Sequence, residues 1–232
     1  VKEFFDGNGS TFDGYVEIIQ KISSYANEKN VDFVQIGTEL KNLNPNIIKS
    51  DRWGEIIKGI RKEFGGKLIY AYNLGPEGSG ERSLQQIKAI WEGVDYIGIN
   101  FFPNQTLKSK KYYTSADVTN ALQNVVFDGK NAFSILKSVS TNFNKAIIFT
   151  ETSFPPWRGS VNWMFRQSCD YQNKGKKGWI YTVGPFSTKE PSRIAALVLA
   201  DGWFKAVKDL DFVHGATHVF WYKTWYDGKN FH

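Results

Sequence analysis

Two glutamates, Glu39 and Glu151, each follow a threonine at the end of an apolar segment. The preceding residues read FVQIGT and IIFT, which is typical of buried strands. A carboxylate beside such a strand is costly, because an apolar environment disfavours its charged form. One glutamate alone could be a strand-end residue that pairs with a nearby lysine or arginine. The repetition of a Thr-Glu pair at two strand ends favours a role in chemistry.

A pair of carboxylates at one site is suited to the cleavage of a glycosidic bond. In the retaining form of this reaction, a carboxylic acid protonates the leaving oxygen while a second carboxylate attacks the anomeric carbon. The two carboxyl groups are about 5–5.5 Å apart. The acid needs a raised pKa, which a partly buried position beside a second negative charge provides. The sequence therefore predicts that Glu39 and Glu151 converge on a gap that fits one sugar linkage.

The elements that would position these glutamates alternate between helix and strand. Apolar residues recur at helical spacing over 12–29, 53–64, 84–91, 116–127, 132–140 and 191–209. Short apolar runs predict strands over 31–36, 67–72, 94–102, 146–150 and 216–222. Strands joined by crossover helices form a parallel sheet. In a parallel α/β barrel, functional residues gather at the carboxyl ends of the strands, where both glutamates are expected.

A closed barrel is favoured over an open, nucleotide-binding sheet. The glycine-rich loop at 75–80 follows a strand, but its glycines lack the spacing of a dinucleotide fingerprint. Residues 155–190 are rich in Gly, Pro, Lys and Trp, which indicates a long loop insertion. Pro191 suits the first turn of the helix that follows. The inward face of that helix is expected to carry Ile194, Leu197, Val198 and Phe204.

Length and composition fit a single globular domain over residues 1–232. The net charge of +6 comes from 29 basic and 23 acidic residues, and only 108–111 and 174–177 are densely basic. Without a nucleic-acid-binding motif, we expect no nucleic-acid partner. No apolar run approaches the ~18 residues of a membrane helix, so we expect no membrane partner. The three histidines lack metal-ligand spacing, so neither a metal nor another cofactor is expected.

Four segments resemble clan A glycoside hydrolases, and most closely family 113, the barrel-type β-1,4-mannanases. They are IGTEL at 36–40, YIGINFFP at 96–103, FTE at 149–151 and FW at 220–221. The resemblance implies the C-terminal part, about strands four to eight, of a (β/α)8 TIM barrel. It implies that Glu39 is the acid/base after strand four and that Glu151 is the nucleophile after strand seven. The implied activity is retaining hydrolysis of a β-linked polysaccharide, in the manner of an endo-β-1,4-mannanase.

Contacts to the sugar are expected from polar and aromatic residues, which make up the floor and walls of such sites. The resemblance implies that Trp221 is the floor of the subsite before the scissile bond. Further candidates, each of which could instead be a rim residue or hold a loop together, are Tyr72, Asn73, Asn100, Phe102, Trp157 and Trp225. Clan A enzymes commonly place a tyrosine near the end of strand six, where this chain has Asn100, Phe101 and Phe102. If Phe101 fills that place, the nucleophile loses a hydrogen-bond donor, and either Tyr72 substitutes for it or activity suffers.

Strands one to three of such a barrel precede the chain if residues 31–36 form strand four. Five strands do not close a barrel, so we expect an upstream segment or another chain to supply the missing strands. A rival hypothesis is a non-catalytic barrel that binds carbohydrate or serves as a structural module in a larger assembly. Fold alone does not decide between the two. A polysaccharide substrate would place the protein outside the cell, either secreted or at the cell surface.

Overall fold

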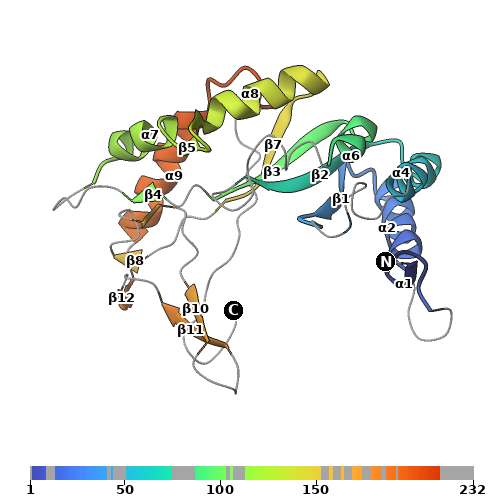
Figure 1. The fold of residues 1–232 in the computed structure, drawn as a ribbon, viewed down its shortest axis with the longest axis horizontal. Helices are drawn as coiled ribbons and strands as arrows, with labels where there is room; N and C mark the ends of the chain where they lie inside the picture. The colour runs from blue at the N-terminus through green and yellow to red at the C-terminus, as the bar shows by residue number, and fades with distance from the viewer. Residues whose placement is uncertain are drawn as a thin grey trace.

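The computed structural model describes residues 2–8, 14–40, 43, 51–74, 87–102, 105–106, 113–152, 157–158, 163–164, 169–173, 179–183, 187–191 and 193–214. Its centre is a four-stranded parallel sheet in the order β1-β2-β3-β7 (Figure 1). The strands are β1 (Phe33–Thr38), β2 (Lys67–Leu74), β3 (Tyr96–Phe101) and β7 (Ile147–Glu151). Four predicted strands are therefore confirmed, and the fifth, at 216–222, lies outside the described residues.

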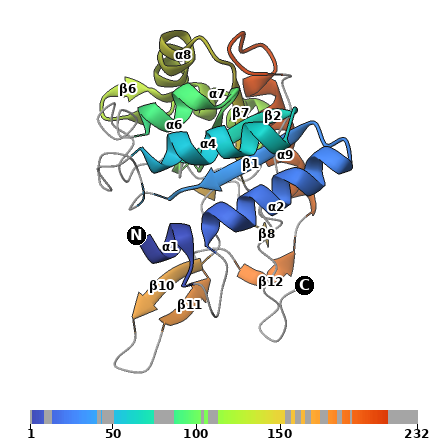
Figure 2. The same ribbon diagram turned by 90° about the vertical axis from the view of Figure 1, so that its right-hand side faces the viewer.

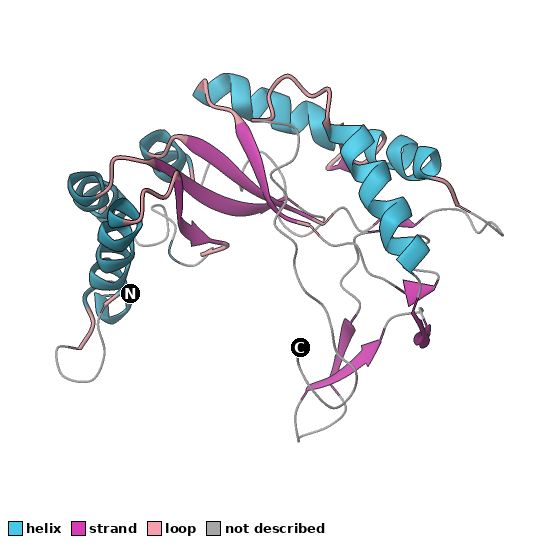
Figure 3. Ribbon diagram, turned by 180° about the vertical axis from the view of Figure 1, so that it is seen from behind, coloured by secondary structure: helices cyan, strands magenta, loops and turns pink. Residues whose placement is uncertain are grey.

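Helices connect successive strands and form the outer side of an arch, with the sheet on its inner side (Figures 1 and 3). They are α1 (Lys2–Asp6), α2 (Tyr15–Glu28), α4 (Arg52–Glu63), α6 (Lys88–Gly93), α7 (Ser115–Gln123), α8 (Ala132–Phe143) and α9 (Arg193–Val207). Figure 2 shows α2 and α4 side by side over β1. This alternation of strand and helix confirms the C-terminal part of a (β/α)8-type barrel.

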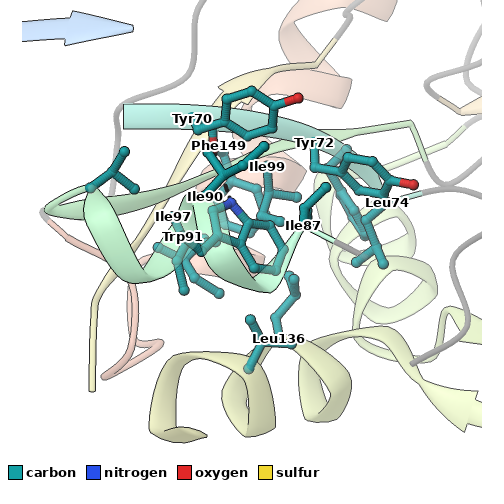
Figure 4. Packing of buried hydrophobic residues seen from close by; sticks show 14 of the residues in the cluster. Tyr70, Tyr72, Leu74, Ile87, Ile90, Trp91, Ile97, Ile99, Leu136 and Phe149 are labelled. Atoms are coloured by element: carbon teal, nitrogen blue, oxygen red, sulfur yellow. Dashed lines mark hydrogen bonds between the residues drawn. The ribbon is translucent and has the colours of Figure 1, made fainter. Parts of the chain in front are cut away.

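Alternate residues of each strand face the helices, as the pleat of a strand requires. On β2 these buried residues are Tyr70, Tyr72 and Leu74 (Figure 4). The ring of Tyr72 packs against Trp91 of α6, and that of Tyr70 against Trp53 of α4. The indole Nε1 of Trp91 donates a hydrogen bond of 3.1 Å to the backbone oxygen of Tyr70. The ring and the hydrogen bond together attach α6 to the centre of the sheet, and the opposite side of each strand is left to line the barrel interior.

Local signals explain where several elements end. Thr114 and Asp117 form a reciprocal capping box at the start of α7. The helical pattern expected over 116–127 ends early, because Asp128 and Gly129, both with positive φ, form a tight turn. That turn joins the short antiparallel strands β5 (Val126–Phe127) and β6 (Lys130–Asn131).

The segment 155–190, expected to be a loop insertion, contains short antiparallel strands within its described part. Its longest pair is the hairpin of β10 (Cys169–Asn173) and β11 (Trp179–Val183). The others are β8 (Trp157–Arg158), which pairs with β12 (Ser187–Pro191), and β9 (Trp163–Met164), which pairs with β4 (Gln105–Thr106). Pro191 therefore ends a strand, and α9 begins after it.

The predicted inward face of α9 is wrong for Ile194, Leu197 and Phe204, whereas Val198 is partly buried and packs against the core as expected. Ile194 and Leu197 are 73% and 67% exposed, and Phe204 is 37% exposed. The buried residues of this helix are instead Leu199, Trp203, Ala206 and Val207. The helix is apolar around most of its circumference, so periodicity alone does not select a face. Close packing does: a Cβ on Gly202 would lie 2.5 Å from Cβ of Val118, so only glycine allows α9 to approach α7 this closely.

The two outer strands of the sheet have different surroundings. Beyond β7, the backbone N–H of Ile147 donates to Phe212 O at 2.8 Å, and His214 N–H donates to Ile147 O at 2.9 Å. The chain thus begins to pair with β7 in parallel just before the predicted fifth strand. On β1, the edge opposite β2 has no strand beside it among the described residues. Strand three of a complete barrel would occupy that edge.

Candidate active site

Glu39 follows a bulge in β1. Gln35 pairs with Ile69 and Thr38 pairs with Ala71, so β1 has one residue more than β2 between these two pairs. A bulge of this kind bends the strand and changes the direction of the side chains that follow. The backbone N–H of Glu39 still donates to Ala71 O at 3.1 Å, which fixes the strand end against β2.

The backbone of Glu39 is itself unusual, with a left-handed φ of 51°. Among the described residues, the other non-glycine positions with positive φ are Asn30, Asp128 and Asn144, whose side chains tolerate this region. A glutamate there costs roughly 1–2 kcal/mol. Such costs are found mainly where they position a functional side chain.

Glu151 also follows an irregularity in its strand. Ile99 pairs with Phe149 and Asn100 pairs with Glu151, so Thr150 is an extra residue in β7. Thr150 is only 1% exposed, and its hydroxyl is hydrogen-bonded to the side chain of Asn100. Bulges beside both glutamates are what redirect the two carboxylates from alternate faces of their strands toward one place.

The two carboxylates meet around the side chains of Thr38 and Asn100. Asn100 Nδ2 donates to Glu39 Oε1 at 2.8 Å and lies 3.0 Å from Thr38 Oγ1. Thr38 Oγ1 donates to Glu151 Oε1 at 3.5 Å. The amide oxygen of Asn100 accepts a hydrogen bond of 2.6 Å from Thr150 Oγ1. One small polar cluster thus connects the carboxyl ends of β1, β3 and β7.

The electrostatics of the pair follow from this closeness. Burial raises the pKa of Glu151, and the negative charge of Glu39 raises it further. The hydrogen bonds from Thr38 and Asn100 act in the opposite direction and only partly offset the rise in pKa. An acid must hold a proton and a nucleophile must be charged. The shift in the pKa of Glu151 therefore favours an assignment of roles opposite to that implied by the resemblance.

Tyr72 does not face the opening at the carboxyl ends of the strands, which we call the mouth. Its position in the sequence had suggested a contact with the sugar there. It is 4% exposed, and its ring packs edge-on against Trp91 with centroids 6.4 Å apart (Figure 4). The pleat of β2 turns this side chain toward the helices. Its pKa is raised mainly by burial and secondarily by the charge of Glu39. We assign Tyr72 to the core.

Asn73, the next residue on β2, faces the other way. It pairs in register with Asn100, and its Oδ1 is buried without a hydrogen-bond partner among the described residues. A buried polar atom without a partner is unusual in a folded protein and calls for a ligand, a water or a missing protein group. Phe102, directly after β3, is partly buried. Both are at the edge of the sheet that carries the carboxylates.

For the other predicted sugar contacts, which are all tryptophans, the structure does not describe the side chains. Trp157 belongs to β8, where only its backbone is described. Trp221 and Trp225 lie outside the described residues. The structure adds Thr38 and Thr150, which the sequence marked only as the partners in a repeated Thr-Glu pair. It also adds Thr152, a fully buried residue whose hydroxyl has no partner among the described residues.

Within the described part of the chain, no group of three or more His, Cys, Asp and Glu side chains could hold a metal ion. In the same residues, no helix has the length and apolar character needed to cross a membrane.

A parallel sheet with helices on its outer side, and a carboxylate pair at the carboxyl ends of its strands, is typical of barrel-type glycoside hydrolases. The model of Glycoside Hydrolase Family 113 matches residues 8–191. The chain belongs to this family. None of the curated proteins compared with the chain matches it.

Solved structures of the family have the same fold. The GH113 β-mannanase AaManA from Alicyclobacillus acidocaldarius, in complex with ManMIm, is 16% identical and superposes with a TM-score of 0.54. A GH113 β-1,4-mannanase is 15% identical, with a TM-score of 0.52. The first match covers 90% of this chain and the second 89%, but each covers only 50% of the mannanase. The chain therefore spans about half the length of these structures.

Proposed function

We propose that this chain carries the catalytic carboxylates of a retaining glycoside hydrolase that cleaves β-1,4-mannan or a similar β-linked polysaccharide internally. The observation that carries the proposal is the contact of both Glu39 and Glu151 with the Thr38–Asn100 pair. Membership of family 113 supports it independently. Two convergent carboxylates have no purpose in a module that only binds neutral sugars.

In the proposed reaction, Glu39 protonates the departing glycosidic oxygen while Glu151 attacks the anomeric carbon. The resulting glycosyl-enzyme is hydrolysed when Glu39, now a base, takes a proton from water. The charge of each carboxylate raises the free energy of charging the other, so the pair favours holding one proton. One proton shared by two carboxylates is the state from which this reaction starts.

Neutral sugars are bound by hydrogen bonds and by stacking on aromatic rings. Asn73 offers a buried acceptor without a partner at the mouth, which suits a sugar hydroxyl. Phe102 is close enough in sequence to β3 to form part of the same rim. Trp157, Trp221 and Trp225 remain proposed stacking platforms. A polysaccharide substrate also supports a location outside the cell, secreted or at its surface.

We propose that the remaining barrel strands come from an upstream segment of the protein or from another chain. The edge of β1 is open within the described residues. On the adjacent helix α2, Ile18, Ile22 and Tyr25 form an apolar stripe and are 43%, 49% and 61% exposed. These residues recur every three to four positions, as on a buried helix face. A further strand and helix would cover both the edge and the stripe.

A non-catalytic barrel that binds carbohydrate is the alternative. The observation that favours it is the end of β3, where Asn100 and Phe101 occupy the stretch that carries a tyrosine in many clan A enzymes. Phe101 is fully buried against Trp203 and Phe149, so it does not contact a substrate. The carboxylate pair opposes this alternative.

The deciding experiment assays the full-length protein on mannan, cellulose and xylan. Glu39→Gln and Glu151→Gln keep the size of each side chain and remove its acid–base or nucleophilic chemistry. Glu92→Gln on α6 is the control, because Glu92 is exposed and its carboxylate forms a surface ion pair with Lys88. We expect mannan cleavage that survives Glu92→Gln and is lost in the other two variants. A wild type that binds mannan without cleaving it would establish the alternative.

A further inference from the structure

Asn100 uses both of its hydrogen-bond donors within the protein. Its side chain is fully buried. A side-chain amide has two N–H hydrogens, and Nδ2 of Asn100 contacts two acceptors, Glu39 Oε1 and Thr38 Oγ1. The amide oxygen accepts from Thr150. Asn100 therefore has no free donor for a sugar hydroxyl, although its place at the end of β3 suggested a substrate contact.

The orientation of this amide is determined by its neighbours. In the charged form that Glu39 takes as the base of the second step, its carboxylate only accepts hydrogen bonds, so the nitrogen of Asn100, and not its oxygen, must face it. A hydroxyl such as that of Thr150 can donate to the oxygen on the other side. A flipped amide would bring two acceptors together at Glu39.

Thr38 connects Asn100 to the second carboxylate, that of Glu151. Because its oxygen accepts from Asn100, its single hydrogen is available for Glu151 Oε1. The hydrogen bonds of the cluster therefore all point toward the glutamates. Thr150 donates to Asn100, and Asn100 donates to Glu39 and Thr38. Thr38 in turn donates to Glu151. One buried amide sets the positions of both carboxylates, which come from strands on either side of it.

We propose that Asn100 is a positioning residue that, together with Thr38, holds the acid/base and the nucleophile at their working separation and supports their negative charge. This inference rests on the proposed hydrolase function. It also assigns to Asn100 a role other than sugar binding.

The test uses two isosteric substitutions in the full-length protein. Asn100→Asp keeps the acceptor for Thr150, loses both donors and adds a negative charge. Thr38→Val removes the donor to Glu151 and the acceptor of one Asn100 N–H, at an exposed position where folding should tolerate it. Ser140→Ala is the matched control, since it removes a buried hydroxyl that donates to Lys145 O at 2.7 Å, on α8.

Two readouts are measured for each variant. The first is the pH profile of kcat/KM on mannan, with kcat and KM separated at the optimum. The second is the titration of ¹³C-labelled glutamate carboxyls by NMR, assigned with Glu39→Gln and Glu151→Gln, which does not depend on turnover. Melting temperatures report the structural cost of each change.

The side chains of Thr38 and Asn100 lower the pKa of Glu151, so their loss should raise it further. For Asn100→Asp we expect the NMR titration of Glu151, and its limb of the pH profile, to move to higher pH. We also expect kcat to fall about 100-fold, as for a small misplacement of catalytic groups, with little change in KM. Thr38→Val should also move the Glu151 titration and its limb to higher pH, with a smaller fall in kcat. Ser140→Ala should change the melting temperature alone.

If Asn100→Asp lowers the melting temperature but leaves the titration of Glu151 where it was, the positioning role is overturned, whether or not the wild type is active. If the titrations move as expected in a protein that cleaves no glycan, the hydrogen-bonded pair stands and the hydrolase function fails. If Asn100→Asp raises KM while kcat and the titrations stay unchanged, Asn100 is a sugar contact and the inference is wrong.

Discussion

The hydroxyl of Thr38 lies 3.5 Å from Oε1 of Glu151, although the two residues are 113 positions apart and belong to the outermost strands of the sheet. In a flat sheet, β1 and β7 would be separated by about 14 Å, three times the usual distance between neighbouring strands. A threonine and a glutamate are too short to cover that distance. Their contact requires the sheet to curl, as the strands of a barrel do. The curvature that defines the fold is therefore also what creates the carboxylate pair.

The roles of the two glutamates can be separated by chemical rescue. With an activated β-mannoside and sodium azide, Glu151→Ala should yield the α-mannosyl azide, because azide enters from the face that the missing nucleophile leaves open. Glu39→Ala should yield the β-mannosyl azide, because azide intercepts a glycosyl-enzyme formed on Glu151. Without azide, the loss of acid–base catalysis in Glu39→Ala should slow mannan cleavage by about 10²–10⁴-fold. NMR of the products identifies the anomers. If Glu151→Ala instead gave the β-mannosyl azide and Glu39→Ala the α-mannosyl azide, the two roles would be reversed. The raised pKa of Glu151, taken alone, favours that reversed assignment.

The stability of the protein should depend on pH through Glu151. Burial and the charge of Glu39 raise the pKa of this group in the folded state, so the folded protein binds its proton more tightly than the unfolded chain does. The folded state therefore loses stability as pH rises from the ordinary glutamate pKa through the raised value. Glu151→Gln removes this loss. We expect the variant to melt at a higher temperature than the wild type at pH 7, and the difference to vanish near pH 3.

The control for this measurement is Glu63→Gln, at an exposed position on α4. Its melting temperature should follow that of the wild type at both pH values. A Glu151→Gln variant that is less stable than the wild type at pH 7 would contradict the prediction.

Neighbouring residues of β2 should differ in their effect on catalysis. Asn73→Ala removes the buried acceptor that faces the mouth, and we expect KM for mannan to rise by about 2–10-fold, the worth of one hydrogen bond. Tyr72→Phe changes a side chain that faces the helices, and should leave kcat and KM within about twofold. Steady-state kinetics on both variants tests the placement. A large fall in kcat for Tyr72→Phe would show that its hydroxyl serves the nucleophile after all.

Strand packing near the site should depend on Gly98. A Cβ at this position would lie 2.8 Å from Ala71 Cα and 2.9 Å from Tyr70 O, both backbone atoms that cannot move independently. Gly98→Ala should therefore separate β2 from β3 and cost about 1–3 kcal/mol of unfolding free energy. In Gly65→Ala the nearest atom is Asn27 Oδ1 at 3.9 Å, so that control should be neutral or slightly stabilising. Urea unfolding measures both, and equal losses would contradict the argument.

Much of the architecture could be predicted because it depends on local sequence. Apolar runs and helical spacing indicated the four strands of the central sheet and most helices, since each side of an element must meet the core or solvent. The two glutamates were recognisable because a charged residue after a buried strand is rare without a purpose. The inward face of α9 could not be predicted, because that helix is apolar nearly all round and the contact of Gly202 with α7 selects the buried side.

By itself, the sequence determined that parallel strands alternate with helices and that Glu39 and Glu151 stand at strand ends. Only the tertiary structure decided that the two meet. The bulges before each glutamate, the left-handed backbone of Glu39 and the amide of Asn100 between them depend on how neighbouring strands pair. Strand pairing joins residues far apart in the chain, so no local pattern encodes the register shift of one residue that turns a side chain toward the mouth or away from it.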